Sequence, residues 1–237
     1  MSVRHYSRVS AVSLLLLPLA VHSAETPAPA EPASAATAPS SNNDQALYAI
    51  GVLLARNLRA FALTPADVAR VQAGLADEAG GKATVDLDKA TPLIQALEKE
   101  RQPLALARQE QLGKAYADKA AAEPGAPRTR SGIVMTTLEE GTGPSPSAAD
   151  RVKVHYEGRL IDGSVFDSSI RRNEPATFPL KGVVPCWTEA VQEMKMGGSA
   201  RVVCPADLAY GDRGSPPRIP GGATLGFEIR LLDVLGP

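Results

Sequence analysis

The spacing of the apolar residues changes abruptly at the segment Glu123-Pro124-Gly125-Ala126-Pro127. Before this segment, apolar residues recur every three or four positions, as in helices, and after it they alternate with polar residues, as in strands. Proline and glycine end a helix that reaches them. Because 237 residues suffice for two small domains, we expect an all-α domain over residues 44–123 and a β-rich domain over residues 124–237.

The all-α domain is expected to contain three helical stretches. The first carries one apolar stripe, formed by Tyr48, Ile50, Leu53, Leu54, Leu58 and Phe61. Thr64-Pro65-Ala66-Asp67 has the capping hydroxyl, the proline and the early acid of a helix start, and Gly80-Gly81 ends that helix. The third stretch, residues 88–122, contains Pro103, which is expected to kink it or divide it in two.

These three stretches are poorly suited to fold as an independent globular domain, because they contain few aromatic side chains and one long helix. An apolar stripe that finds no partner within its own chain is often buried against a second copy. We therefore favour a homodimer formed through residues 44–123 over a self-contained helical bundle.

The β-rich domain contains four segments with the composition of strands, at residues 131–137, 152–156, 200–204 and 225–231. Asp162-Gly163 is a tight-turn dipeptide between two such runs. One short helix is expected over residues 185–194, with Trp187, Val191 and Met194 on one face, and Gly197-Gly198 ends it. The predicted class is α+β, an antiparallel sheet with one helix packed across it.

The first 24 residues have the pattern of a secretory signal peptide. Arg4 and Arg8 precede a short apolar run over residues 11–21, and small residues follow it. The run is shorter than the ~20 apolar residues that span a bilayer, so we favour cleavage over a retained anchor, with no stable membrane insertion afterwards. Residues 25–43, rich in Pro, Ala and Ser, are expected to form a disordered tether. The mature protein is then expected to be periplasmic or secreted.

Charge and motif content argue against several classes of function. The chain has 25 basic and 26 acidic residues and so lacks the basic surface typical of nucleic-acid binding. After signal removal, His155 is the only histidine, in an alternating strand where it is expected to face outward, so a hydrolase is remote. The two cysteines lack the spacing of metal ligands, and no glycine-rich phosphate loop is present. We expect neither a metal nor a cofactor.

Six of the ten aromatic residues lie in the last 87 residues, at Tyr156, Phe166, Phe178, Trp187, Tyr210 and Phe227. Such a concentration indicates a small aromatic core, an apolar pocket, or both. For Trp187 and Phe227 alone we would favour the core. Because several members of the set are expected on loops, where binding residues gather, we favour a pocket for the set as a whole.

Six motifs follow one another in this region: residues 152–160, Asp162-Gly163, Phe166-Asp167-Ser168-Ser169, residues 183–187, Leu208-Ala209-Tyr210-Gly211, and Ile219-Pro220 with Ala223-Thr224-Leu225. In these motifs the chain, from Pro127 onward, resembles FKBP-type peptidyl-prolyl cis-trans isomerases. The helical part, with Tyr48-Ala49-Ile50-Gly51, resembles the dimerisation domain of the macrophage infectivity potentiator-like subgroup. The resemblance implies a half-open antiparallel sheet wrapped around one short helix, with the site between them.

The resemblance also implies roles for individual residues. Trp187 would floor a prolyl pocket, with walls from Tyr156, Phe166, Val183, Val184, Ile219, Tyr210 and Phe227. Asp167 would lie at its edge, held by Tyr156 and Arg172. The backbone N–H of Val184 and the hydroxyl of Tyr210 would bind the substrate's carbonyls. Asp167, Tyr210, Tyr156 and Phe227 would be the catalytic set, and macrolide inhibitors become candidate ligands.

Two points stay open within that resemblance. Ala176 stands where the family often has an aromatic residue, and the loop between Phe178 and Val183 is about two residues shorter than in some relatives, so contact area is expected to be smaller. Asp167 either polarises the substrate carbonyl or only braces Tyr156 and Arg172. We favour bracing, because buried carboxylates are usually paired.

Cys186 begins the short helix and Cys204 ends the strand that follows. From the turn at Gly197-Gly198, eleven helical residues run back about 16 Å and six strand residues run forward about 20 Å, so the two cysteines are expected to finish close together. We favour a disulfide in an exported protein. Two buried free thiols remain the alternative, since a bond also requires matching Cβ geometry.

The sequence thus predicts a peptidyl-prolyl cis-trans isomerase that assists the folding of exported proteins and acts on proline-containing unfolded polypeptides. It would bind the twisted X–Pro amide better than the planar forms in an apolar pocket, without a nucleophile. The alternative is a non-catalytic chaperone or scaffold that holds clients in the dimer cleft, and Ala176 keeps that alternative open.

Overall fold

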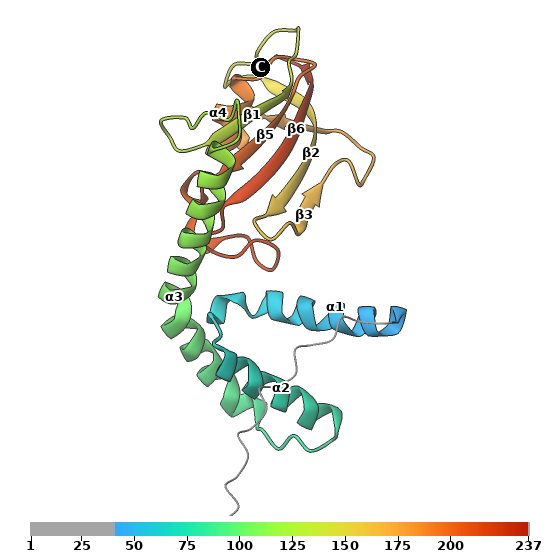
Figure 1. Cartoon of the computed structure of the whole chain (residues 1–237), viewed down its shortest axis with the longest axis vertical. Coiled ribbons are helices and arrows are strands. Elements are labelled where there is room, and N and C mark those ends of the chain that lie inside the picture. The colour runs from blue at the N-terminus through green and yellow to red at the C-terminus, as the bar shows by residue number, and fades with distance from the viewer. Residues whose placement is uncertain (1–40, 237) are drawn as a thin grey trace, which may run out of the picture.

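The computed structural model describes residues 41–236 (Figure 1). The expected signal peptide and residues 25–40 of the expected tether lie outside the described residues. Helix α1, Asn42–Asn57, begins two residues before the expected start of the helical domain because Ser41 caps it. The Ser41 hydroxyl accepts a hydrogen bond from the backbone N–H of Asp44 at 3.1 Å, and the Asp44 carboxylate accepts one from the Ser41 N–H at 3.2 Å. Residues 42 and 43 therefore belong to the helix and not to a tether.

Helix α2, Pro65–Ala79, begins and ends where the sequence predicts. Thr64 caps it in a reciprocal pair with Asp67, Pro65 occupies the first turn, and Gly80 follows the last residue. The hydrogen bonds that Asp67 accepts from the backbone and side chain of Thr64 lower the pKa of its carboxyl to about 2. Arg101 of the next helix also donates to Asp67, at 3.2 Å, and so ties α2 to α3.

Helix α3, Leu87–Ala121, is continuous over 35 residues although Pro92 and Pro103 lie inside it. Of the two outcomes expected at Pro103, a kink or a division, the helix is not divided and instead bends (Figure 1). A proline removes one backbone donor and crowds the preceding turn, which a helix absorbs by bending when strong helix formers flank the site. Such residues surround Pro103 on both sides.

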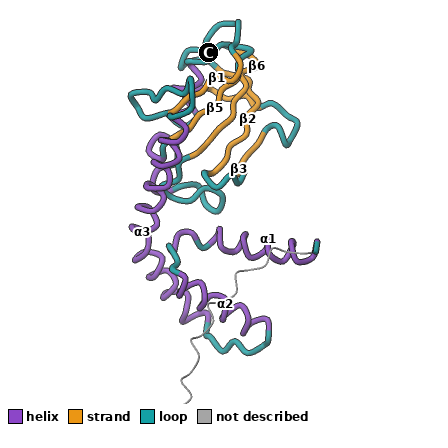
Figure 2. The backbone as a smooth tube through the Cα atoms, viewed as in Figure 1, coloured by secondary structure: helices purple, strands orange, loops and turns teal. Residues whose placement is uncertain are grey.

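The C-terminal domain is a six-stranded antiparallel sheet around one helix, as predicted (Figure 2). Its elements are β1 Val134–Glu139, β2 Arg151–Leu160, β3 Val165–Ser168, β4 Ala176–Pro179, helix α4 Pro185–Gln192, β5 Ser199–Cys204 and β6 Leu225–Val234. The strand order is β1-β5-β6-β2-β3, and β4 also pairs with β2. Strands β3 and β4 were not predicted from the sequence, since each has only four residues.

Alternation along the long strands sends one face of the sheet into the core. In β2, Val152, Val154 and Tyr156 are buried, whereas Lys153 between them is exposed. The buried face packs on Trp187, Val191 and Met194, the three residues predicted to share one side of the short helix. The helix and the inner face of the sheet therefore form one apolar core.

The end of α3 packs against the opposite face of the sheet. Ala117 of α3 lies in a small buried cluster with Val134 of β1 and Val203 of β5. Gly226 of β6 lacks a side chain where the Tyr116 hydroxyl approaches, since a Cβ there would lie 3.0 Å from that oxygen. Helix α3 thus joins the two domains through direct packing and not only through the chain.

Helix α1 presents apolar side chains to solvent. Its exposed large residues include Tyr48, Ile50, Leu53 and Leu54, each more than 40% exposed. In Figure 1, α1 projects away from α3 below the sheet domain. Within residues 41–236, no helix combines the length and the apolar character required to cross a membrane.

Candidate functional site

Five aromatic rings pack together between α4 and the sheet. The indole of Trp187, in the first turn of α4, meets the rings of Tyr156, Phe227 and Phe178 edge to face, with centroid distances of 5.2, 5.3 and 5.9 Å. Phe166 of β3 packs on Phe227 at 5.7 Å in the same geometry. Edge-to-face contacts hold aromatic rings in fixed orientations. The site therefore has a rigid aromatic base.

Trp187 lies deep in this cluster, and its side chain is 4% exposed. Its Nε1–H has no hydrogen-bond partner among the described residues. Phe166, Val183 and Val184 are only partly buried and pack against the same cluster. The indole thus forms the base of the site, and these three side chains form its accessible part.

Tyr156, Asp167 and Arg172 form a hydrogen-bonded triad beside the aromatic rings. The Tyr156 hydroxyl donates to one carboxylate oxygen of Asp167, and Arg172 donates to the other. Arg172 also lies 3.4 Å from the Tyr156 hydroxyl. Both oxygens of Asp167 are therefore engaged, in the bracing arrangement that the sequence favours.

The triad shifts the acidities of its members. Partial burial raises the pKa of the Asp167 carboxyl, but the hydrogen bonds from Tyr156 and Arg172 outweigh it, so the net pKa lies below the usual value. Burial, and then the hydrogen bond to Asp167, raise the pKa of the Tyr156 phenol. The hydrogen bond to Asp167 also raises the pKa of Arg172. At neutral pH the triad is a carboxylate, a neutral phenol and a guanidinium.

The structure brings together nine of the ten residues predicted to bind substrate. Seven belong to the apolar cluster: Tyr156, Phe166, Val183, Val184, Trp187, Ile219 and Phe227. Asp167 and Arg172 join it through Tyr156. Tyr210 is the tenth: its neighbours Leu208 and Ala209 pack against the cluster, and its own side chain is 41% exposed, just before the 3-10 turn Gly211–Arg213.

Two further residues hold this site in place, and neither was assigned a role from the sequence. Ser169 is fully buried, and its hydroxyl accepts a hydrogen bond from the Tyr156 N–H at 2.7 Å while its own N–H donates to the Tyr156 carbonyl at 3.0 Å. Gly158 lies under the rings, since a Cβ there would lie 2.5 Å from Phe166 Cζ and 3.0 Å from Phe227 Cε1. Both residues occur within the six family-like motifs of the sheet domain, which is the signal that could have identified them.

Other sequence expectations concern the surroundings of the site. His155 does not face fully outward; it is partly buried, and its Nδ1 lies 3.1 Å from the Ser169 hydroxyl. Ala176 lies on β4 opposite Val154 and packs against the core.

Cys186 and Cys204 form a disulfide, with Cα atoms 5.7 Å apart. No group of His, Cys, Asp and Glu side chains within residues 41–236 is arranged to hold a metal ion.

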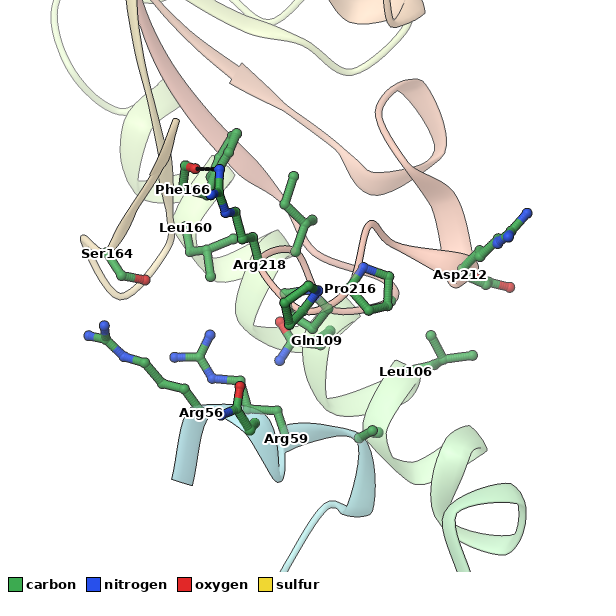
Figure 3. Close-up of a pocket in the computed structure, with 18 of the residues that line it drawn as sticks. Arg56, Arg59, Leu106, Gln109, Leu160, Ser164, Phe166, Asp212, Pro216 and Arg218 are labelled. Atoms are coloured by element: carbon green, nitrogen blue, oxygen red, sulfur yellow. Dashed lines mark hydrogen bonds between the residues drawn. The ribbon is translucent and has the colours of Figure 1, made fainter. Parts of the chain in front are cut away.

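A cleft of about 1190 Å³ opens beside the site, between the helical domain and the sheet domain. Phe166, Asp167, Arg172 and Ile219 line it on the sheet side. Trp187 does not line this cleft, so the cleft adjoins the aromatic base without including it. Figure 3 shows Arg56 of α1 and Arg59 of the 3-10 helix that follows it, Arg59–Phe61, on one side of the cleft, with Ser164 and Phe166 on the other.

Comparison with known families matches both domains. A family described as FKBP-type peptidyl-prolyl cis-trans isomerase matches residues 143–232. A second family, described as the domain amino terminal to FKBP-type peptidyl-prolyl isomerase, matches residues 43–135. The two matches together span the helical and the sheet domains.

Individual relatives agree with these families. The FKBP-type 22 kDa peptidyl-prolyl cis-trans isomerase of Escherichia coli K12 is 37% identical over 195 residues, covering 81% of this chain and 95% of that protein. Peptidyl-prolyl cis-trans isomerase Mip of Coxiella burnetii is 45% identical over 112 residues, covering 47% of this chain and 49% of that protein. The crystal structure of FkpA from Escherichia coli superposes with a TM-score of 0.61 at 33% identity, covering 83% of this chain and 98% of that one.

Proposed function

This chain belongs to the family of FKBP-type peptidyl-prolyl cis-trans isomerases and has their activity, and we propose from this that it accelerates the isomerisation of X–Pro bonds in exported, incompletely folded polypeptides. The observation that carries the proposal is the aromatic site based on Trp187, with Tyr156 fixed beside it by Asp167 and Arg172. The site offers apolar surface for a proline ring and polar groups for the adjoining peptide bonds.

Catalysis at such a site needs no nucleophile. Rotation about an X–Pro bond meets a barrier of about 18–20 kcal/mol, because the planar amide is stabilised by resonance. The twisted amide has lost that resonance and is less charge-separated than either planar form. An apolar surface therefore binds the twisted form better, and a difference of about 5 kcal/mol would accelerate the reaction several thousandfold.

Two polar groups are suited to hold the substrate's carbonyls. The backbone N–H of Val184 precedes α4 and donates to no described residue. The Tyr210 hydroxyl also has no hydrogen-bond partner in the described part of the chain, and the side chain is 41% exposed. We assign both as donors to the peptide that flanks the proline, since unpaired donors at the rim of an apolar site favour a bound carbonyl.

We assign Asp167 a bracing role and not a direct one. Both of its oxygens already accept hydrogen bonds, from Tyr156 and Arg172. Because its pKa is lowered, the Asp167 carboxyl is ionised at neutral pH and has no proton to donate to a substrate carbonyl. Its role is to hold the Tyr156 ring in its edge-to-face contact with Trp187 and so to preserve the shape of the pocket.

The exposed apolar residues of α1 support a homodimer through the helical domain. Leu47, Ile50 and Leu54 are 67%, 53% and 41% exposed and recur at the spacing of one helix face. A stripe of this kind remains stable in water when a second copy covers it. The charged N-terminal pattern and the disulfide support export to an oxidising compartment.

A second candidate function is that of a chaperone or scaffold that holds clients without catalysis. An apolar groove of about 630 Å³ between α1, α2 and α3 favours it, with Tyr48, Leu54, Val68, Val71, Leu75 and Leu112 among its lining residues. Extended apolar grooves bind unfolded segments, which are rich in exposed apolar side chains. Ala176, which offers little contact area, is also consistent with a weakened prolyl pocket.

A refolding assay separates the two functions. The refolding rate of a substrate protein limited by a cis-proline is measured with wild type and with Phe227→Ala, in parallel with suppression of aggregation. We expect Phe227→Ala to lose most of the rate enhancement and to keep the suppression of aggregation. Wild-type protein that suppresses aggregation without accelerating refolding would favour the chaperone and exclude the isomerase.

A further inference from the structure

The cleft between the two domains continues directly from the proposed prolyl site. Phe166, Asp167 and Ile219 line the cleft and also belong to, or are held against, the aromatic cluster. The opposite wall consists of α1, the 3-10 helix Arg59–Phe61 and the middle of α3. A polypeptide whose proline occupies the site therefore places its neighbouring residues in the cleft. The chemistry of the cleft walls then determines which neighbouring residues bind well.

The wall formed by the helical domain is basic. Arg56 of α1 and Arg59 of the 3-10 helix after it extend across the cleft (Figure 3), and Lys99 of α3 lines it as well. Arg59 and Arg56 both contact Asp162 in the turn after β2, with Arg56 Nε at 3.8 Å. Lys99 has no ion-pair partner among the described residues.

The wall formed by the sheet domain is also basic, with Arg171, Arg172, Arg213 and Arg218. In the part of the chain that the structure describes, Arg218 is held only by the carbonyl of Phe166, at 3.4 Å (Figure 3). Arg213 has no ion-pair partner within residues 41–236. The cleft is therefore lined from both sides by positive side chains that the protein itself only partly neutralises.

Acidic side chains in the cleft are fewer. Seven basic and three acidic residues line it, the acids being Glu98, Asp167 and Asp212. One of these three, Asp167, is already paired with Arg172. The excess of positive charge is local to the cleft, because the whole chain has a formal net charge of −1. A concave surface with one sign of charge concentrates ligands of the opposite sign.

We propose that this cleft binds the segment of the substrate that flanks the isomerised proline, and that it selects segments rich in aspartate and glutamate. The inference rests on the proposed function for the placement of the proline and names a substrate class for it. Exposed ion pairs each change affinity by about 1.4- to 5-fold. Two or three such pairs would therefore give a preference of about tenfold at low salt, which screening would remove.

The test uses two pairs of fluorescently labelled twelve-residue peptides with a central Ala-Pro. In one pair, four residues before the alanine are all Glu or all Gln, and in the other pair the same change follows the proline. Fluorescence anisotropy gives each Kd at about 20 mM and about 300 mM NaCl. We expect the Glu peptide of at least one pair to bind about tenfold more tightly at low salt, with little difference at high salt. Equal Kd values for Glu and Gln peptides in both pairs would overturn the proposal.

A matched pair of variants tests whether the preference for Glu peptides arises in the cleft. Arg56→Gln with Lys99→Gln removes two charges from the cleft, while Arg59 keeps its contact with Asp162. Arg70→Gln with Lys82→Gln removes two exposed charges from the helical domain outside the cleft. We expect the first variant to lose most of the preference for Glu peptides and the second to keep it. An equal loss in both variants would assign the preference to overall charge and contradict the proposal.

Catalysis is measured separately with a short neutral proline tetrapeptide, which carries no acidic side chain for the cleft to select. We expect wild type and Arg56→Gln with Lys99→Gln to show the same kcat/KM on it. Absence of catalysis by wild type would overturn the proposed function. The anisotropy experiment would still decide whether the cleft selects acidic segments, because it measures binding without turnover.

Discussion

The hydroxyl of Tyr156 on β2 donates a hydrogen bond to the carboxylate of Asp167 on the neighbouring strand β3. Arg172 holds the other oxygen of the same carboxylate. Since Tyr156 packs edge to face on Trp187 at 5.2 Å, the polar triad and the aromatic base are connected in one structural unit. We expect catalysis at the prolyl site to depend on that unit.

A double-mutant cycle tests whether Asp167 acts through Tyr156. We expect Tyr156→Phe and Asp167→Ala each to lower kcat/KM on a proline tetrapeptide by about 3- to 10-fold, the range of a typical intramolecular hydrogen bond. The double variant is expected to be little worse than either single variant, because both changes break the same contact. Fully additive losses would instead give Asp167 a direct role on the substrate.

The lowered pKa of Asp167 predicts how this residue affects stability with pH. A carboxyl whose pKa is lower in the folded than in the unfolded protein stabilises the fold above its unfolded pKa, near 3.8, and this contribution is lost as the pH falls through the folded pKa. Urea unfolding of wild type and Asp167→Asn should therefore differ at pH 7 and at pH 5 by the same amount. The difference should shrink below pH 3.8. A difference that grows with acidification would contradict the assignment.

Gly158 is predicted to be essential for the placement of the two phenylalanine rings. A methyl group there would lie 2.5 Å from Phe166 and 3.0 Å from Phe227, so Gly158→Ala should displace both rings. We expect a loss of stability of about 1–3 kcal/mol and at least a tenfold loss of kcat/KM. Gly74→Ala is the control, because its Cβ would meet nothing within 4 Å. Unchanged activity in Gly158→Ala would show that ring placement does not limit catalysis.

The apolar stripe of α1 predicts the state of association. Leu47→Glu with Ile50→Glu places two charges on the exposed stripe, and sedimentation velocity should report a monomer where wild type is a dimer, since burying an unpaired charge opposes association. Gln45→Glu with Ala49→Glu adds the same charge to the opposite side of α1 and should leave the dimer intact. A monomeric wild type would refute the dimer.

The α+β architecture was predictable because each long element carries its own periodic signal. The alternation in β2 and β6 and the capping sequence at Thr64 act over a few residues, so the sequence displays them directly. The fate of α3 at Pro103 was less predictable. Bending and breaking differ by only a small free energy, which packing elsewhere in the fold decides.

The site was predictable to the extent that motifs carry it. The nine residues that meet at or beside Trp187 come from β2, β3, α4, β6 and the loops between them, and only the family resemblance related them before the structure. Ser169 and Gly158 act through a backbone contact and through the absence of a side chain. Such roles depend on three-dimensional neighbours, as does the basic cleft, whose walls come from both domains.

The most direct test of catalysis by the aromatic site is the rate of cis-trans exchange in a short proline tetrapeptide, measured by NMR with wild type and with Trp187→Ala. We predict that wild type accelerates the exchange at least a hundredfold, about 2.7 kcal/mol of barrier, and that Trp187→Ala loses most of this effect while circular dichroism reports a folded sheet domain. Exchange at the uncatalysed rate with wild type, or full activity without the indole, would contradict the proposed mechanism.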